Sequence, residues 1–587
     1  MSDFNPLANA KIPTHRSGFD LSQKRLFTAK VGEILPVYWQ IAIPGSKYRI
    51  SADSFTRTVP VNTAAYTRIK EYYDFFAVPL RLISRALPQA FTQMTDYQTS
   101  AMSSTQNTAI LKDVPYTTLL DIGQELSGMM TGPYATDDAG LPSTGGAIKL
   151  LQYLGYGSVL PSTMQDRSQI SAKYCVALGT AEDKDNPLLY VNNLSVNLLP
   201  LAAYHKIYYD FFSNSQWERH LAFTYNFDWW DGVSPIQTFD SRMFILHYAN
   251  YPKDWIFGVL PNSQFGNVAL LQPRFNSTLD SNIIVAPDNP DVTAGASSLY
   301  IPAGSIAAGV GSTTGSARNV MLNANLSALS IRATEYLQRW KEIVQFSSKD
   351  YTDQIEAQFG IHAPEYMGNH CHYIGGWNSV ISINEVINQN LDTNDSQASI
   401  AGKGVGSNSG HSIEYTVGAE HCVIMCVYHS MPLVDWDLSG QSPQLTIHSI
   451  EDFPQPAFDQ LGMEGVPAYN IANSVEESAT APIGYNLRYW QWKSCIDVVC
   501  GGFSHFASYK SWVAPLTWSN VLGHSNSSTG TYYFNYRAMK VLPQQMNFIF
   551  NSQVSPDTAT IDTDQLLCNV NFQVYATQNL DRNGLPY

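Results

Sequence analysis

The stretch QLLCNVNFQVYA, residues 565–576, alternates between apolar and polar side chains with a period of two. Its apolar positions, Leu566 among them, would share one face, while Asn569, Asn571 and Gln573 would share the other. Because successive side chains of a strand point to opposite faces of a sheet, this pattern predicts a half-buried β-strand. Similar stretches, bounded by Gly, Pro, Asn or Ser, lie at 31–43, 68–78, 421–429 and 532–542. The sequence therefore predicts a mainly β protein.

Helical periodicity is confined to a few segments between these strands. One covers 201–212, a second follows Pro79 through LRLISRALPQAF, and a third covers 327–346. A fourth, 348–359, is expected to begin at a capping Ser and to stop at Gly360. Because the helices do not alternate regularly with the strands, the pattern argues against a doubly wound parallel sheet.

Two long stretches depart from the β texture and are expected to be insertions into one domain, residues 1–587. Residues 98–200 mix turns, Gly and short apolar pieces, and 262–325 are rich in Gly, Ser, Ala and Thr with little charge. The glycine-rich segment GKGVGSNSG, 402–410, could suggest a phosphate-binding loop, but it does not open a helix. We interpret it as a hairpin loop.

Composition limits the class of protein. Only 14% of the 587 residues are charged while 12% are aromatic, which favours β-structure and large interfaces and excludes wholesale disorder. The chain has neither a signal-like start nor a run of 18 apolar residues, so we expect a soluble, non-exported protein without membrane insertion. Seven scattered cysteines, an odd number, favour a reducing compartment.

Charge is distributed unevenly along the chain. The formal net charge is -15, yet residues 1–70 carry ten basic and four acidic side chains, or +6, which leaves -21 for the remainder. A basic start on an acidic body is typical of an inner nucleic-acid face and an outer solvent face, although a solubilising tail remains an alternative. The predicted nucleic-acid-binding residues lie in a basic N-terminal arm, 1–50: Lys11, Arg16, Lys24, Arg25 and Lys30. Tyr38, Trp39 and Tyr48 could stack on bases, but core packing is favoured for each.

Signatures of catalysis and metal binding are weak. The chain lacks a GxSxG elbow, HExxH, a Walker loop and paired CxxC motifs. On a strand, Cys422 and Cys426 would face away from His421 and His429, so buried structural cysteines are favoured over a metal site.

The triplet 370–372, His-Cys-His, lacks an evident third ligand, and a structural role is again favoured. Carboxylates on the expected helices fit ordinary solvated faces: Glu335, Glu342, Asp350, Asp353 and Glu356. We expect no cofactor, no bound metal and no enzymatic activity. A carbohydrate-binding or carbohydrate-active β-protein, with carboxylates paired only by the fold, stays open as the alternative.

The segment FTRTVPVNTAAYTRIKEYYDFFAVPLRL, 55–82, closely resembles the major capsid protein of microviruses, the small single-stranded DNA bacteriophages, and particularly of gokushovirus-like ones. HRSGFDLS and FTAKVGEILPVYW upstream are similar to the same family. Further blocks resemble it in the expected order: YHKIYYDFFSNSQW, APEYMG, EHCVIMCV, FDQLGMEGV, DQLLCNVNFQV and a terminal GLPY. The resemblance is looser in 253–266, 436–452 and 488–530, which indicates a divergent branch.

The resemblance implies an eight-stranded antiparallel jelly roll of the viral capsid type, with long inter-strand insertions and a few helices. It also implies sixty copies in a T=1 icosahedral shell around circular single-stranded DNA, assembled in the bacterial host cytoplasm with internal scaffolding and DNA pilot proteins. In that family the stretch corresponding to 262–325 is the most variable insertion and forms a protrusion at the threefold axes. Attachment to a host surface receptor, for which a glycan is one candidate, is its expected use.

Overall fold

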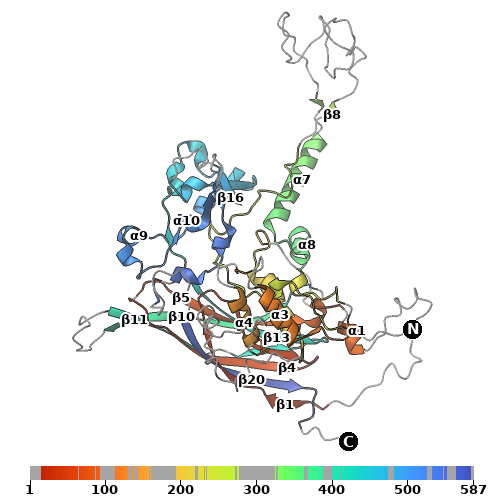
Figure 1. Ribbon diagram of the computed structural model, residues 1–587. Coiled ribbons are helices and arrows are strands. Elements are labelled where there is room, and N and C mark those ends of the chain that lie inside the picture. Colours follow the sequence, from red (N-terminus) through yellow and green to blue (C-terminus); the bar gives the residue numbers. More distant parts are fainter. Residues whose placement is uncertain are drawn as a thin grey trace, which may run out of the picture.

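The computed structural model (Figure 1) describes residues 15–63, 65–85, 87–92, 113–129, 135–137, 143–157, 159, 194–218, 222–230, 232, 234–270, 274–275, 324–325, 328–362, 368–387, 400–409, 412–473, 481–524, 532–546, 548–550 and 564–582. Lys11, most of 262–325 and much of 98–200 lie outside these described residues.

One large sheet dominates the fold. Its strands are β1 (Ser17–Asp20), β2 (Gln23–Ala29), β3 (Leu35–Ala42), β4 (Lys47–Thr58), β5 (Ile69–Pro79), β10 (His372–Ile387), β11 (Ile400–Ser409), β12 (Ile413–Thr416), β13 (Cys422–Pro432) and β20 (Leu566–Gln578). The order is β1-β20-β4-β11-β10-β5-β13-β3, with β2 also paired to β20 and β12 to β4. Every pairing in this sheet is antiparallel. The predicted mainly β, antiparallel architecture is therefore confirmed.

The sheet curls into a half-barrel because side chains from the two ends of its strand order pack together. Tyr38 on β3 lies 5.5 Å from Phe572 on β20, measured between ring centroids, and Phe27 on β2 lies 5.1 Å from Tyr428 on β13. Along β20 alternate residues are buried, as the two-residue period of the sequence predicts. The buried apolar faces of β2, β4 and β20 thus meet those of β3, β5 and β13 in one core.

The expected insertion 98–200 contributes helices to this core. Its described residues form β6 (Tyr116–Thr118), α3 (Leu119–Met129), α4 (Ser143–Tyr153) and β7 (Ser195–Asn197), and β6 pairs with β7. Helix α4 contacts β3, and the Trp39 indole N–H donates to the Leu154 carbonyl at 2.8 Å. Ile122 and Leu150 belong to the same set of buried residues as the sheet. The described part of this insertion therefore completes the core.

The remaining helices largely match expectation. Helix α6 (Leu199–Ile207) continues into a π-helical turn, Tyr208–Phe212, and α7 spans Ala328–Phe346. Helix α8 (Tyr351–Phe359) ends at Gly360 with φ of 67°, but its cap is Asp350, which accepts the Thr352 backbone N–H, and not Ser348. After Pro79 the chain forms a 3₁₀ turn, Leu80–Leu82, and then α1 (Leu87–Thr92). One continuous helix is wrong here because Pro88 fits only a first helical turn.

Two other predictions need correction. GKGVGSNSG is not a hairpin loop: its residues up to Ser409 belong to β11, which pairs with both β10 and β4. Gly404 and Gly406 are needed there because an added Cβ would meet Thr58 at 2.5 Å or Glu71 at 3.2 Å. The stretch 532–542 is a strand only over β19 (Tyr532–Phe534), after which a 3₁₀ turn, Tyr536–Met539, follows.

A second group of short elements lies between β13 and β20. It comprises β14 (Trp436–Asp437), β15 (Met463–Pro467), β16 (Pro482–Leu487), α9 (Gly502–His505), β17 (Leu516–Thr517), α10 (Trp518–Val521), β18 (Leu522–His524) and β19. Figure 1 shows this region on one side of the sheet, with α7 rising away from the sheet beside it. Near the outer end of α7, β8 (Arg274–Phe275) pairs with β9 (Ala324–Asn325), so the two described ends of the 262–325 insertion lie side by side.

Candidate nucleic-acid interface

The outer face of β2, β20, β4 and β11 combines cations with exposed aromatic rings. Along β4 the odd-numbered residues Lys47, Arg49 and Arg57 are exposed, because the even-numbered residues face the core. On β20 the exposed neighbour of Arg49 is Tyr575, and the exposed neighbour of Arg57 is Leu567. Cations and ring faces together are the surface that binds single-stranded nucleic acid without reading its sequence.

Contacts on this face hold the rings and charges in place. The Arg57 guanidinium carbon lies 5.0 Å from the centroid of the Phe55 ring, a cation–π arrangement. Phe55 is 37% exposed and Tyr575 is 54% exposed, so both rings can be reached from solvent. Each is therefore available to a planar base.

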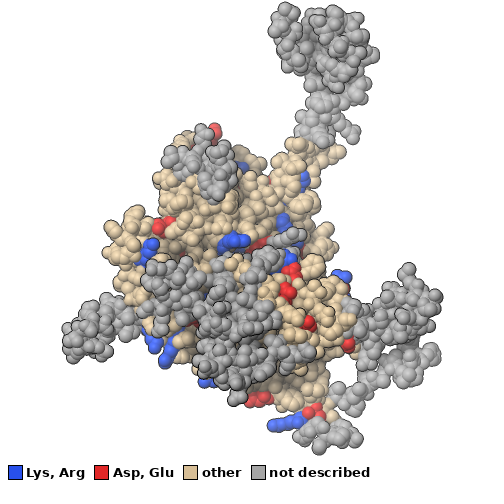
Figure 2. All heavy atoms as spheres, in the orientation of Figure 1, with Lys and Arg blue, Asp and Glu red and all other residues tan. Residues whose placement is uncertain are grey.

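The described side chains of this face carry a positive balance. Lys24, Lys47, Arg49, Arg57 and Lys403 are its five exposed cations. The exposed carboxylate of these strands is Asp53, and the flanking strands β1 and β12 add Asp20 and Glu414, so the local balance including those strands is +2 on a chain whose net charge is -15. Figure 2 shows Lys and Arg at the lower left of the molecule, near β11 in the orientation of Figure 1, and both Lys or Arg and Asp or Glu at the bottom.

The five residues predicted from the sequence do not gather on one surface. Lys24 is exposed on β2 beside Asn571 of β20, within the face described above. Arg25, the next residue, points to the opposite side of the pleat and is half-buried beside Val570. Lys11 lies outside the described residues.

The Arg16 side chain and the Lys30 backbone both make hydrogen bonds within the protein. The Arg16 guanidinium donates to Asn579 Oδ1 at 2.7 Å and to the Gly45 carbonyl at 2.6 Å, which ties two chain segments together. The Lys30 backbone N–H donates to Glu33 Oε2 at 2.8 Å. A DNA-binding role for the five predicted residues stays a prediction. Sequence reasoning missed Lys47, Arg49 and Arg57, although their two-residue spacing in a β-rich stretch was a readable signal.

The expected structural cysteines and aromatic residues are buried. Cys422 and Cys426 lie in the core, and burial raises the pKa of the Cys422 thiol to about 12, which keeps it protonated. Tyr38 and Tyr48 are also buried, in agreement with core packing. His370 Nε2 lies 2.9 Å from Asp350 Oδ2 and forms an ion pair when the imidazole is protonated. Within the described ranges no three His, Cys, Asp or Glu side chains gather in a way that could hold a metal ion.

No helix in the described part of the chain combines the length and apolar character needed to cross a bilayer. The described fold is a mainly β, antiparallel half-barrel with few helices.

Comparison with known proteins identifies the kind of structural protein. The family model described as "Capsid protein (F protein)" matches residues 10–121 and 171–517, more than half of the chain. The chain belongs to this family of phage capsid proteins, which confirms its recognition as a major capsid protein of microvirus type. It is also similar to "Capsid protein VP1" of Chlamydia phage 1, with 22% identity over 253 residues. That alignment covers 38% of this chain and 42% of the relative's length. The family to which this chain belongs is a family of structural proteins, and a capsid protein is located in the virion.

Proposed function

We propose that sixty copies of this chain close a T=1 icosahedral shell around a circular single-stranded DNA genome, with the outer face of β2, β20, β4 and β11 turned toward the DNA. The observation that carries the orientation is the basic and aromatic character of this face on an otherwise acidic protein. Shell formation itself is supported by membership in the capsid family.

The proposed subunit fold is an eight-stranded jelly roll. Strands β2, β20, β4 and β11 would form one sheet of four, and β10, β5, β13 and β3 the other, joined along the pairing of β10 with β11. This division is supported by the aromatic contacts across the core between Tyr38 and Phe572 and between Phe27 and Tyr428. The long insertions would then follow β5 and β13.

Contacts between copies would cover the apolar residues that a single chain leaves exposed. Helix α7 has one buried residue, Gln345, while several of its large apolar side chains are exposed. They are Leu329, Ile331, Tyr336, Leu337 and Trp340. A helix with this surface is stable in water when other chains cover it. We place α7 and the 262–325 insertion at a threefold axis, where three copies would meet, project outward and attach to a host receptor.

Assembly is proposed to take place in the bacterial host cytoplasm with scaffolding and DNA pilot proteins, without enzymatic turnover by this chain. The test is the mass of the protein in purified particles. Sixty chains of 65.2 kDa amount to about 3.9 MDa of protein, which mass photometry or analytical ultracentrifugation can distinguish from a monomer. A carbohydrate-active monomer, the alternative, would sediment near 65.2 kDa. A stable monomer in infectious particles would contradict the proposal.

A further inference from the structure

Helices α7 and α8 bury little of their own surface. No residue of α8 is buried, and its Tyr351 and Phe359 are 73% and 69% exposed. Helix α7 buries only Gln345. Because packing stabilises an element roughly in proportion to the apolar area removed from water, these helices gain little from it. The polar contacts at their base therefore decide how firmly they are held on the body of the protein, the half-barrel with α6.

Neutral hydrogen bonds join the turn between α7 and α8 to the loop after the π-helical turn. Gln216 Nε2 donates to the carbonyl oxygens of Gln345 at 2.8 Å and of Ser347 at 2.7 Å. The Lys349 backbone N–H donates to Ser215 Oγ at 3.3 Å. None of these amide, carbonyl and hydroxyl groups gains or loses a proton near neutral pH, so these bonds hold the turn whether the solution is mildly acidic or mildly alkaline.

His370 adds a contact that depends on a proton. Its Nε2 lies 2.9 Å from Asp350 Oδ2, and the same oxygen accepts the Thr352 backbone N–H that caps α8. On the other side of the ring, Nδ1 lies 3.8 Å from Oδ1 of Asp210, which belongs to the π-helical turn. The imidazole therefore lies between a carboxylate of α8 and a carboxylate of the body.

The charged groups around the ring favour its protonated form. An imidazolium carries N–H on both nitrogens, whereas a neutral ring turns a lone pair toward one of the two carboxylates. The contact with Asp350 is the largest influence on the pKa of His370 and raises it. Burial lowers this pKa, the charge of Asp210 raises it, and the charge of Lys206 on α6 lowers it slightly, so that the net direction is upward.

The groups on the body side of this site keep their charge near neutral pH. Asp210 pairs with the Lys206 ammonium at 2.7 Å and accepts the Cys371 backbone N–H at 2.8 Å. Burial raises the pKa of the Tyr225 hydroxyl and of the Cys371 thiol, the neighbouring titratable groups, so both stay neutral. Of the described groups at this site, His370 is therefore the one that titrates near neutral pH.

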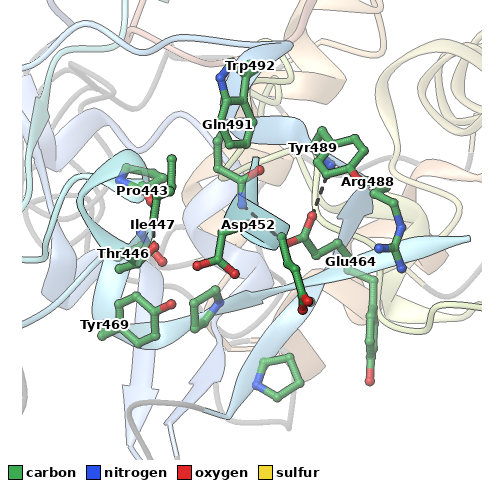
Figure 3. Close-up of a pocket in the computed structure, with 16 residues that line it drawn as sticks. Pro443, Thr446, Ile447, Asp452, Glu464, Tyr469, Arg488, Tyr489, Gln491 and Trp492 are labelled. Carbon is green, nitrogen blue, oxygen red and sulfur yellow. Dashed lines mark hydrogen bonds between the residues drawn. The ribbon is translucent and has the colours of Figure 1, made fainter. Parts of the chain in front are cut away.

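Helix α7 has a second support, in the region between β13 and β20. Gly462 approaches it so closely that an added Cβ would meet Glu342 Oε1 at 3.0 Å. Gly462 directly precedes β15, which forms part of the wall of the pocket in Figure 3. Neither His370 nor Asp350 lines that pocket. The support of α7 is thus independent of the histidine, and only α8 and its first turn depend on it.

We propose that His370 is a pH-dependent latch for α8: its protonated ring holds Asp350, and with it the first turn of α8, against the body, and loss of the proton loosens that helix. Because the pKa of His370 is raised, its contribution is complete below the ordinary value of 6.5 and is lost as the pH rises through the raised value. The inference goes beyond the proposed function, since it concerns a single subunit. It sets how firmly the base of the element that carries the 262–325 insertion is held.

Backbone hydrogen exchange read by mass spectrometry tests the latch on the purified full-length protein, from about pH 6 to about pH 9, with correction for the intrinsic pH dependence of exchange. We expect the protection of α8 peptides to fall about two- to fivefold over this range, the effect that a partly exposed ion pair supports. Strand β20 should keep its protection. Exchange of the imidazole C2 hydrogen in the same samples should give a pKa above 6.5 for His370.

Two variants separate the latch from the fold. In D350N an asparagine can still cap α8 but has no charge, so this variant should lower the pKa of His370. D350N and H370N should both show the low protection of α8 at every pH. The matched control is H362N, which removes the exposed pair of His362 with Glu356 beside the same helix and should keep the pH dependence of the parent.

Several outcomes would overturn the latch. They are protection of α8 that does not change with pH in the parent, an unchanged pH dependence in D350N or H370N, and loss of that dependence in H362N. An equal loss of protection at β20 would indicate general unfolding and would also overturn it. If H370N fails to fold, D350N decides, because it keeps the cap of α8.

Discussion

At the scale of single residues, Lys149 joins three distant parts of the chain. It lies on α4, its side chain is 14% exposed, and its ammonium is 2.5 Å from Glu33 Oε2 and 3.1 Å from Asp564 Oδ2. Burial is the largest influence on the pKa of Asp564 and raises it, but the Lys149 charge, the hydrogen bond from Thr28 and the Lys30 charge together outweigh burial, so the pKa is lowered. The three charges therefore stabilise one another away from water.

Replacing Lys149 by Met should lower the free energy of unfolding by about 3–5 kcal/mol, because two buried carboxylates would lose their cation. Chemical denaturation of the purified chain measures the change. The control K493M breaks an exposed pair with Asp459 and should cost no more than about 1 kcal/mol. The triple variant K149M/E33Q/D564N should recover part of the loss. A K149M variant as stable as the parent would contradict this account.

A buried pair of imidazoles should make the protein sensitive to acid. His205 Nε2 bonds to the Met243 carbonyl and must carry the proton, so His205 Nδ1 accepts the N–H of His247 Nε2 at 2.9 Å. This arrangement requires the His205 ring to be neutral, because an imidazolium has no nitrogen left to accept a hydrogen bond. Burial lowers the pKa of His205 from 6.5 to about 4, and burial together with His205 and Lys540 lowers the pKa of His247.

Stability should therefore be lost as the pH falls. Below pH 6.5 the unfolded chain binds a proton at His205 that the folded chain excludes. The free energy of unfolding therefore keeps its full value, as far as His205 is concerned, above pH 6.5. Between pH 6.5 and pH 4 it falls by about 3 kcal/mol in all. Chemical denaturation at several pH values in this window measures how steeply the free energy of unfolding changes with pH. In H205N this slope should be shallower by up to about 1.4 kcal/mol per pH unit. An unchanged slope in H205N would exclude this mechanism.

At the scale of elements, side-chain periodicity predicted the strand β20, whose residues are alternately buried and exposed. The periodicity also predicted the helices α6 and α7, although all of α6 is buried and α7 buries only Gln345. Strand β11 was not predicted, because its glycines are required by the close approach of Thr58 and Glu71 from β4 and β5, which are distant in sequence. The cap of α8 was misplaced by two residues, since Ser348 and Asp350 are both good caps.

The pairing of β8 with β9 makes the insertion a separable element. Replacing residues 276–323 by a short Gly-Ser bridge would join two strands that already lie side by side. We expect these particles to assemble and to hold DNA but to adsorb poorly to host cells. Particle mass, DNA content and adsorption rate are the measurements, with a bridge of scrambled order as the control. Normal adsorption would exclude a receptor role, and failure to assemble would instead assign the element to an interface.

At the scale of the whole molecule, the sequence showed which part of the chain holds the excess of cations but not which surface of the folded protein carries them. The excess of cations within 1–70 was visible by counting. Residues 17–50 nevertheless form strands of the sheet, so pleating divides neighbours such as Lys24 and Arg25 between two faces. Only pairing with β20, more than five hundred residues away, brings Lys24 near the cations of β4.

The four-site variant K24Q/K47Q/R49Q/R57Q should bind single-stranded DNA more weakly. Its log-log dependence of affinity on salt should be shallower by about 0.7 for each phosphate that the variant no longer neutralises. Fluorescence anisotropy with an oligonucleotide at several salt concentrations measures both quantities. The control replaces four exposed cations away from this face: Lys253, Arg332, Arg339 and Lys510. Equal slopes for the two variants would exclude this face as the DNA surface.

The position of β20 within the sheet has a consequence for biosynthesis. This strand lies between β2 and β4, and its Val574 N–H donates to the Ser22 hydroxyl across 552 positions of sequence. On the ribosome, β2 and β4 must therefore wait for the strand that separates them until 552 residues have followed Ser22, which slows folding. A chain terminated before β20 would lack the strand that joins β1 and β2 to β4. The order of the strands therefore excludes incomplete chains from the shell, because a chain that ends before β20 cannot complete the sheet that a shell subunit requires.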